Sequence, residues 1–100
     1  MKGELIMDEV FIASLCKNGI LGGALYVDKN YIIYRTNKIT VPEKYRNLKM
    51  PIKDIVEISC GRILFFPTVT ISLKHDYKYK FIIFNRKKFI SSINELRQSL

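Results

Sequence analysis

A run of strictly alternating polar and apolar residues, Thr-Val-Thr-Ile-Ser-Leu-Lys at positions 68–74, most limits the folds open to this chain. Side chains of a β-strand point alternately to its two faces, so the run predicts a half-buried strand with Val69, Ile71 and Leu73 facing the core. After a short turn, residues 77–84 begin the same alternation and predict the second strand of a hairpin. We therefore expect an antiparallel sheet with one buried face.

A second hairpin is predicted near the start of the chain. Residues 23–27 and 31–35 are apolar runs that flank Asp28-Lys29-Asn30. Asn30 can adopt the left-handed conformation that closes such a three-residue connection. The sequence therefore predicts two more neighbouring antiparallel strands.

Two further strands and a loop complete the predicted sheet. Residues 9–16 and 50–59 are rich in β-forming residues, and Pro51 suits the first position of the second of these strands. Residues 36–49 form a long polar segment and predict the most mobile loop. The sheet must curl, because a flat one would leave edges and an apolar face exposed.

The hydrophobic period changes from two to about 3.6 after Asn85, which is a natural helix N-cap. Helical spacing is followed by Phe89, Ile90, Ile93, Leu96 and Leu100. We therefore predict one domain over residues 1–100, with strands at about 9–84 and a single amphipathic helix at about 86–99 that covers the open end of the sheet.

The charge and the cysteine content indicate the kind of partner and the cellular compartment. Seventeen Lys and Arg against nine Asp and Glu leave a net charge of +8, which favours anionic partners. Cys16 and Cys60 lie far apart without metal-site spacing, so we expect buried free thiols in a reducing cytoplasm. The sequence contains no apolar run near the ~20 residues of a membrane span, so membrane contact would be peripheral.

Three blocks, in order, resemble the GRAM domains of the pleckstrin-homology-like superfamily. Residues 22–34 (GGALYVDKNYIIY) are similar to the family core "GG-x-L-y-l-T-n-x-r-l-i-f", although Asp28 stands where Thr is common. Residues 50–58 resemble "i-p-l-x-D-I-x-x-v", and residues 79–90 resemble "y-x-F-v-v-x-x-R-x-x-W", with Phe89 in place of Trp. The resemblance implies a mainly β, partly open antiparallel barrel of seven strands, capped by the C-terminal helix.

Two groups of cations are candidate anion-binding or lipid-binding residues. The first surrounds the long loop and comprises Lys29, Arg35, Lys38, Lys44, Arg46, Lys49 and Lys53. The second, at the helix start, comprises Arg86, Lys87 and Lys88, where backbone N–H groups could join the cations around a phosphate. The resemblance implies that head groups would bind beside the open barrel end. For both groups we favour the simpler interpretation, a solvated basic surface.

An apolar segment between two strands is a candidate for contact with a membrane or a protein partner. It comprises Arg62, Ile63, Leu64, Phe65 and Phe66. Its residues could equally begin the next strand or pack beneath the barrel, and we favour this core interpretation.

Catalysis, metal binding and nucleic-acid binding find little support in the sequence. His75 is the only histidine and falls in a predicted turn, and we find no nucleophile elbow, no metal-ligand spacing and no RNP-type motif. We therefore expect a non-enzymatic binding or adaptor module without a cofactor. Its expected partner is an anionic membrane surface; the alternative is a protein, or a second copy of the chain, bound at a sheet edge or at residues 63–66. Binding of nucleic acid rests on charge alone and is the weakest alternative.

Overall fold

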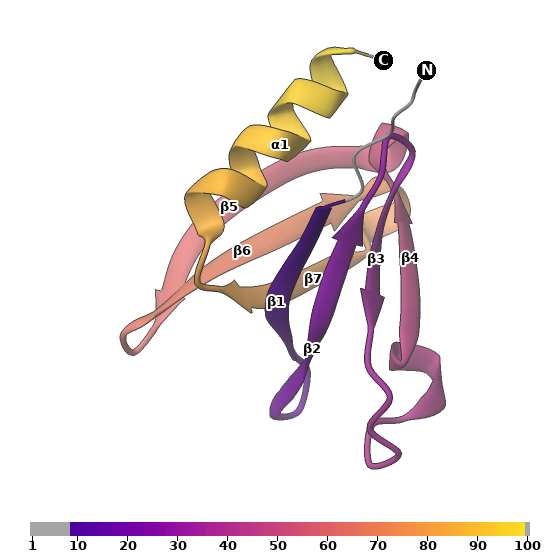
Figure 1. Ribbon diagram of the computed structural model, residues 1–100, viewed down its shortest axis with the longest axis vertical. Helices are drawn as coiled ribbons and strands as arrows, with labels where there is room; N and C mark the ends of the chain where they lie inside the picture. Colours follow the sequence, from indigo (N-terminus) through magenta and orange to yellow (C-terminus); the bar gives the residue numbers. More distant parts are fainter. Residues whose placement is uncertain (1–8, 100) are drawn as a thin grey trace.

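Seven antiparallel strands form the sheet of the computed structural model, which describes residues 9–99 (Figure 1). Their order across the sheet is β4-β3-β2-β1-β7-β6-β5. In chain order the strands are β1 (Glu9–Cys16), β2 (Ile20–Val27), β3 (Tyr31–Arg35), β4 (Asn47–Pro51), β5 (Ile55–Ile63), β6 (Phe66–Leu73) and β7 (Lys78–Ile83). The first strand is central, because β1 pairs with β2 on one side and with β7 on the other.

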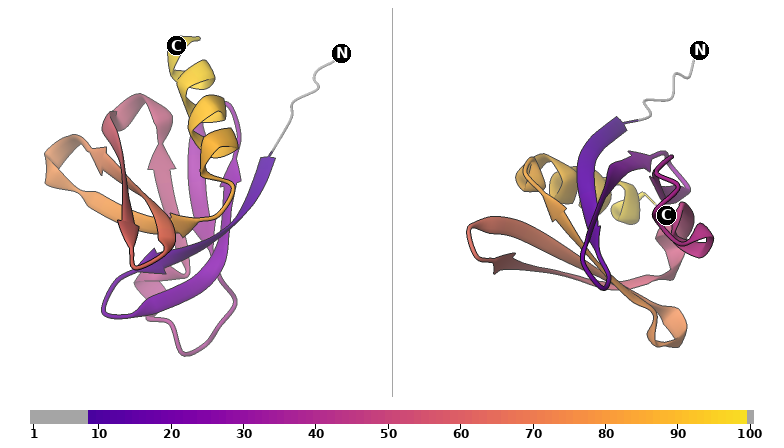
Figure 2. Two further views of the ribbon diagram at one scale, coloured as in Figure 1. Left: turned by 90° about the vertical axis from the view of Figure 1, so that its left-hand side faces the viewer. Right: turned by 90° about the horizontal axis from the view of Figure 1, so that it is seen from below.

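The sheet curls without closing, since β4 and β5 are its two edges. The helix α1 (Arg86–Gln98) lies across the resulting gap, between the β5–β6 hairpin and strands β1 to β4 (Figures 1 and 2). It buries Phe89 and Ile93 in the core, where the ring of Phe89 meets that of Phe11 edge to face at 5.2 Å. The predicted architecture, a mainly β half-barrel capped by one C-terminal helix, is confirmed. Residues 1–8 and 100 of the predicted domain lie outside the described residues.

The alternation that predicted the β6–β7 hairpin is reproduced in the structure. Val69, Ile71 and Leu73 of β6 are buried, as are Phe81 and Ile83 of β7. Strand β6 pairs with β7 on one side and with β5 on the other, so it is an interior strand of the sheet. Because its inward side chains fill the core on every second residue, its pattern is the clearest in the chain.

The prediction of one strand over residues 50–59 is wrong. The chain completes β4 at Pro51, turns through a short 3₁₀ segment at Ile52–Asp54, and starts β5 at Ile55. Ile52 and Ile55 are both buried, so this corner carries the chain from one edge of the sheet to the other. Apolar residues needed at the corner made the segment resemble a continuous strand. The predicted 36–49 loop is correspondingly shorter, because β4 already begins at Asn47.

The turn between β2 and β3 is closed by a side chain, and Asn30 does not adopt the predicted left-handed conformation. The Asp28 carboxylate accepts hydrogen bonds from the backbone N–H groups of Asn30 and Tyr31, both at 2.7 Å. This arrangement, in which an aspartate side chain replaces a backbone acceptor, removes the need for a positive φ.

The prediction that both cysteines are buried is wrong. Cys16 is half-buried at the end of β1, where partial burial raises the pKa of its thiol. Cys60 is exposed on β5, an edge strand beside the gap in the barrel. Both thiols are free.

Tyr34 is buried and donates its hydroxyl hydrogen bond to the backbone carbonyl of Leu21. Burial raises the pKa of Tyr34 above its usual value of about 10. The folding stability that this residue contributes is therefore fully present below about pH 10. It is lost as the pH rises through the raised pKa of the folded state. We expect Tyr34→Phe to cost about 1 kcal/mol near neutral pH, because the Leu21 carbonyl loses its partner. Urea unfolding should also show that the variant loses less stability than the wild type above about pH 10. An equal alkaline loss in both proteins would contradict the assignment.

Candidate anion-binding cleft

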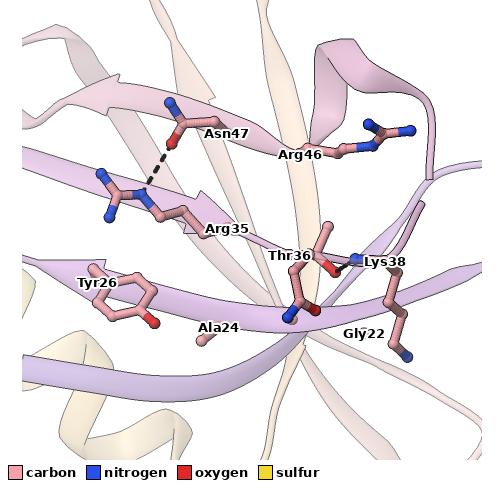
Figure 3. Close-up of a pocket in the computed structure, with 10 residues that line it drawn as sticks. Gly22, Ala24, Tyr26, Arg35, Thr36, Lys38, Arg46 and Asn47 are labelled. Atoms are coloured by element: carbon pink, nitrogen blue, oxygen red, sulfur yellow. Dashed lines mark hydrogen bonds between the residues drawn. The ribbon is translucent and has the colours of Figure 1, made fainter. Parts of the chain in front are cut away.

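An open cleft of about 650 Å³ lies on the outer face of the sheet, beside the loop that joins β3 to β4 (Figure 3). Its floor is the outward face of β2, where Gly22 and Ala24 point outward while Leu25 and Val27 point into the core. Small residues on this face leave room above the strand, and Tyr26 bounds the floor. Its volume falls within the ~300–1,000 Å³ typical of small-ligand sites.

Arg35 stands on one side of the cleft, held by its neighbours on both adjacent strands. The pairing register places it across from Ala24 on β2 and from Asn47 on β4. Its Nε donates a hydrogen bond of 3.0 Å to the Asn47 side-chain oxygen, and its guanidinium lies 5.6 Å from the centre of the Tyr26 ring. These contacts orient the guanidinium while leaving donors for a ligand.

Lys38 reaches over the floor of the cleft from the β3–β4 loop. A Cβ placed on Gly22 would lie 3.1 Å from the Lys38 ammonium, so the missing side chain at position 22 is what lets the lysine approach. Figure 3 shows Lys38 extending toward Gly22 from the segment that follows Thr36. The ammonium is a mobile point charge at the mouth of the cleft.

Arg46 lines the cleft and holds the β3–β4 loop in shape. Its Nε donates to the Val41 carbonyl at 2.7 Å and its Nη2 to the Ile39 carbonyl at 2.9 Å. The backbone joins the two ends of the loop as well, since the Thr36 N–H donates to the Arg46 carbonyl at 3.1 Å. The loop predicted to be most mobile is therefore braced by Arg46.

The cleft is positively charged and rich in hydrogen-bond donors. Three of its lining residues are cations, Thr36, Asn37 and Asn47 add neutral polar groups, and none is acidic. Such a set can bind a phosphate or carboxylate group that approaches from solvent, with the guanidinium of Arg35 and the ammonium of Lys38 as its charged partners.

The structure brings together only part of the first group of predicted cations. Lys29 and Lys53 lie at the opposite end of the sheet from the β3–β4 loop, where the Ile52 N–H donates to the Asn30 carbonyl (Figure 1). Lys49 points outward from β4, with its ammonium 4.5 Å from the centre of the Tyr31 ring. Lys44 lies in the 3₁₀ turn at Glu43–Tyr45, with its ammonium 5.1 Å from the centre of the Tyr45 ring.

The second predicted group, at the start of α1, has contacts of its own. Arg86 Nη1 donates to the Gly61 carbonyl at 2.8 Å and to the Thr68 carbonyl at 3.3 Å, so it ties the helix start to β5 and β6. Lys88 lies 3.9 Å from the Glu9 carboxylate, and Lys87 is exposed. Asn85 occupies the N-cap position but its side chain makes no capping hydrogen bond. The two predicted groups do not share one site.

The apolar segment at residues 62–66 is not part of the core, contrary to the favoured interpretation. Ile63 ends β5 and Phe66 begins β6, so Leu64 and Phe65 form the turn between them, where both are exposed. Arg62 is exposed as well. The apolar residues of this run suggest burial. Leu64 and Phe65 are exposed because they form a tight turn, which no neighbouring strand covers.

Sequence reasoning did not identify the neutral residues of the cleft. The sequence predicts only that Ala24 and Tyr26 belong to a strand and that Asn47 belongs to a loop. One signal was available: positions 22, 24 and 26 alternate with the apolar positions 25 and 27, so they share the outward face of one strand.

The curled antiparallel sheet and its C-terminal helix give this chain the general shape of a pleckstrin-homology-like half-barrel. Its fold is similar to that of the C-terminal domain of an unknown protein from Leishmania infantum, with a TM-score of 0.75 over 96% of this chain and 86% of that one. The two sequences are 10% identical, so the likeness concerns the fold alone.

No protein-family model and no curated protein matches the sequence. Within residues 9–99, no helix is both long and apolar enough to cross a bilayer.

Proposed function

We propose that this chain is a non-catalytic binding module that associates peripherally with an anionic membrane surface, and that the cleft holds an acidic lipid head group. The observation that carries the proposal is that Arg35, Lys38 and Arg46 line one open cleft that has no acidic residue in its lining. Each cation near an anionic surface contributes about 1 kcal/mol of attraction. The net charge of +8 adds a longer-range attraction of the same sign.

The open shape of the cleft also favours a head group over a free metabolite. A ligand that stays attached to a bilayer needs a site reachable from one side, and the β3–β4 loop projects at one end of the sheet (Figure 1). Residues 22–34 resemble the core of GRAM domains, and this resemblance also supports a role in binding lipid. The free thiols Cys16 and Cys60 suit the cytoplasmic side of a membrane.

Co-sedimentation with vesicles tests this function. Pelleting should increase when phosphatidylserine is added to phosphatidylcholine and should be lost above ~0.5 M salt, because salt screens surface attraction. Lys38→Glu replaces an attraction by a repulsion and should weaken binding by ~2 kcal/mol, or roughly 30-fold.

The matched control is Lys53→Glu, which changes the net charge equally but lies at the opposite end of the sheet. We expect the Lys53→Glu protein to bind the anionic vesicles much more tightly than the Lys38→Glu protein does. Equal losses in the two variants would mean that binding depends on total charge and that the cleft is not the site. Equal pelleting with neutral vesicles would contradict the membrane proposal itself.

A further inference from the structure

The turn between β5 and β6 presents two large apolar side chains to solvent. Ile63 pairs with Phe66, so Leu64 and Phe65 are the two residues of the turn. Their side chains are 81% and 90% exposed. Two-residue hairpin turns usually contain Asn, Asp or Gly, whose backbones suit the required conformation. The turn chemistry therefore does not explain why both residues of this exposed turn are apolar.

Leu64 is also held in an unfavourable backbone conformation. Its φ is +55°, in the left-handed region where a Cβ close to the following carbonyl oxygen destabilises most L-residues. A protein with Asn or Gly at position 64 would be more stable, because these residues tolerate a positive φ better than Leu does. A bulky apolar residue retained at such a position is the pattern expected where the side chain itself makes a functional contact.

The hairpin is tied to the start of α1 at a point close to its turn. Arg86 ties the start of α1 to the carbonyls of Gly61 and Thr68, one on each strand. Behind the turn, the rings of Phe66 and Phe84 meet edge to face at 5.7 Å, and both are exposed. Figure 2 shows the β5–β6 hairpin projecting from the side of the half-barrel. The apolar turn is thus a projecting tip on a braced support.

The surroundings of the tip are cationic. Arg62 and Lys87 are exposed on the hairpin and on the first turn of α1. The two segments nearest the tip, residues 58–68 at the end of the hairpin and 84–92 at the start of α1, contain no Asp or Glu. An apolar tip beside cations complements a bilayer, whose anionic head groups overlie a hydrocarbon layer.

We propose that the Leu64-Phe65 turn inserts into an anionic bilayer, with Arg62 and Lys87 in contact with lipid phosphates and the Phe66–Phe84 pair at head-group level. The inference rests on the proposed membrane association and adds the element that enters the hydrocarbon. A bilayer fits better than a protein partner, because a convex tip needs no complementary pocket in a fluid phase. The expected depth is that of an interfacial anchor, about 5–10 Å.

The chain contains no tryptophan, so a Phe65→Trp variant reports on this position alone. Its emission should shift to the blue on addition of vesicles that contain phosphatidylserine, and lipids brominated in their acyl chains should quench it. The matched control is Tyr77→Trp, because Tyr77 is 58% exposed and follows the far end of β6. Its emission should not change.

A second variant separates insertion from a structural role for the turn. Leu64→Asn should raise the unfolding midpoint, since Asn tolerates a positive φ better than Leu. It should also weaken vesicle binding about tenfold or more, the effect expected from losing one buried leucine side chain. A lower unfolding midpoint with unchanged vesicle binding would overturn the inference.

The remaining outcomes distinguish this inference from the function on which it rests. Pelleting of Phe65→Trp with vesicles but without a blue shift would overturn insertion and leave peripheral binding intact. Absence of pelleting for the wild type would overturn both. An emission shift that follows protein concentration without vesicles would identify the turn as a contact between copies of the chain and overturn insertion.

Discussion

A Phe89→Ala variant is expected to lose about 3–5 kcal/mol of folding free energy, the range for removing a fully buried phenylalanine. Phe89 is the aromatic residue through which α1 enters the core, and its ring packs against that of Phe11 on β1. Its loss leaves a cavity beneath the only α-helix in residues 9–99. The gap between the sheet edges would then be covered poorly. Urea unfolding followed by circular dichroism measures the effect.

The control for this variant is Asn94→Ala, because Asn94 is exposed on the same helix. We expect its stability to stay within ~0.5 kcal/mol of the wild type. If Phe89→Ala were equally mild, α1 would be an accessory to the half-barrel and not part of its core.

Two adjacent glycines of β2 should respond differently to alanine. A Cβ on Gly23 would lie 2.5 Å from the Arg35 carbonyl oxygen and 2.9 Å from the Tyr34 ring, so strand β3 would have to move. We expect Gly23→Ala to destabilise the fold by about 1–3 kcal/mol, as overpacking does elsewhere. Thermal and urea unfolding provide the measurement.

Gly22→Ala is the matched control and a test of the cleft at once. Its Cβ would come tightly against only the end of the Lys38 side chain, at 3.1 Å, and Lys38 can move aside. Stability should therefore change by less than ~0.5 kcal/mol. Vesicle binding should weaken, because the methyl group occupies the cleft floor and displaces the ammonium. A Gly22→Ala protein that unfolds like Gly23→Ala would show that the cleft floor has no spare room.

The fold was predictable where local patterns and tertiary packing agree. In β6 every second residue enters the core, so alternation located Val69 and Ile71 correctly. At Ile52 and Ile55 the same apolar residues serve a corner between two sheet edges, and a short window cannot distinguish a corner from a strand. At Leu64 and Phe65 hydrophobicity suggested burial, whereas the two-residue turn leaves them in solvent.

The sequence predicted that the candidate site consists of cations, but not which of the cations lie together. The sequence placed Arg35, Lys38 and Arg46 among ten candidate cations without separating them from Lys29 and Lys53. Consecutive turns of an antiparallel sheet lie at alternate ends, so cations in the β2–β3 turn cannot join those in the β3–β4 loop. The cleft floor depends on strand register and on the space above glycines, which a single sequence does not reveal.

The central position of β1 affects how the molecule can be made. Its pairing of Ala13 with Ile83 joins residues seventy positions apart, so the sheet cannot be completed until β7 has left the ribosome. Until then β1 can pair only with β2. The exposed strand is a surface on which a nascent chain can be held by a chaperone or captured by aggregation. We therefore expect nascent chains stalled before β7 to be degraded rapidly by protease, and full-length chains to become resistant in a single late step.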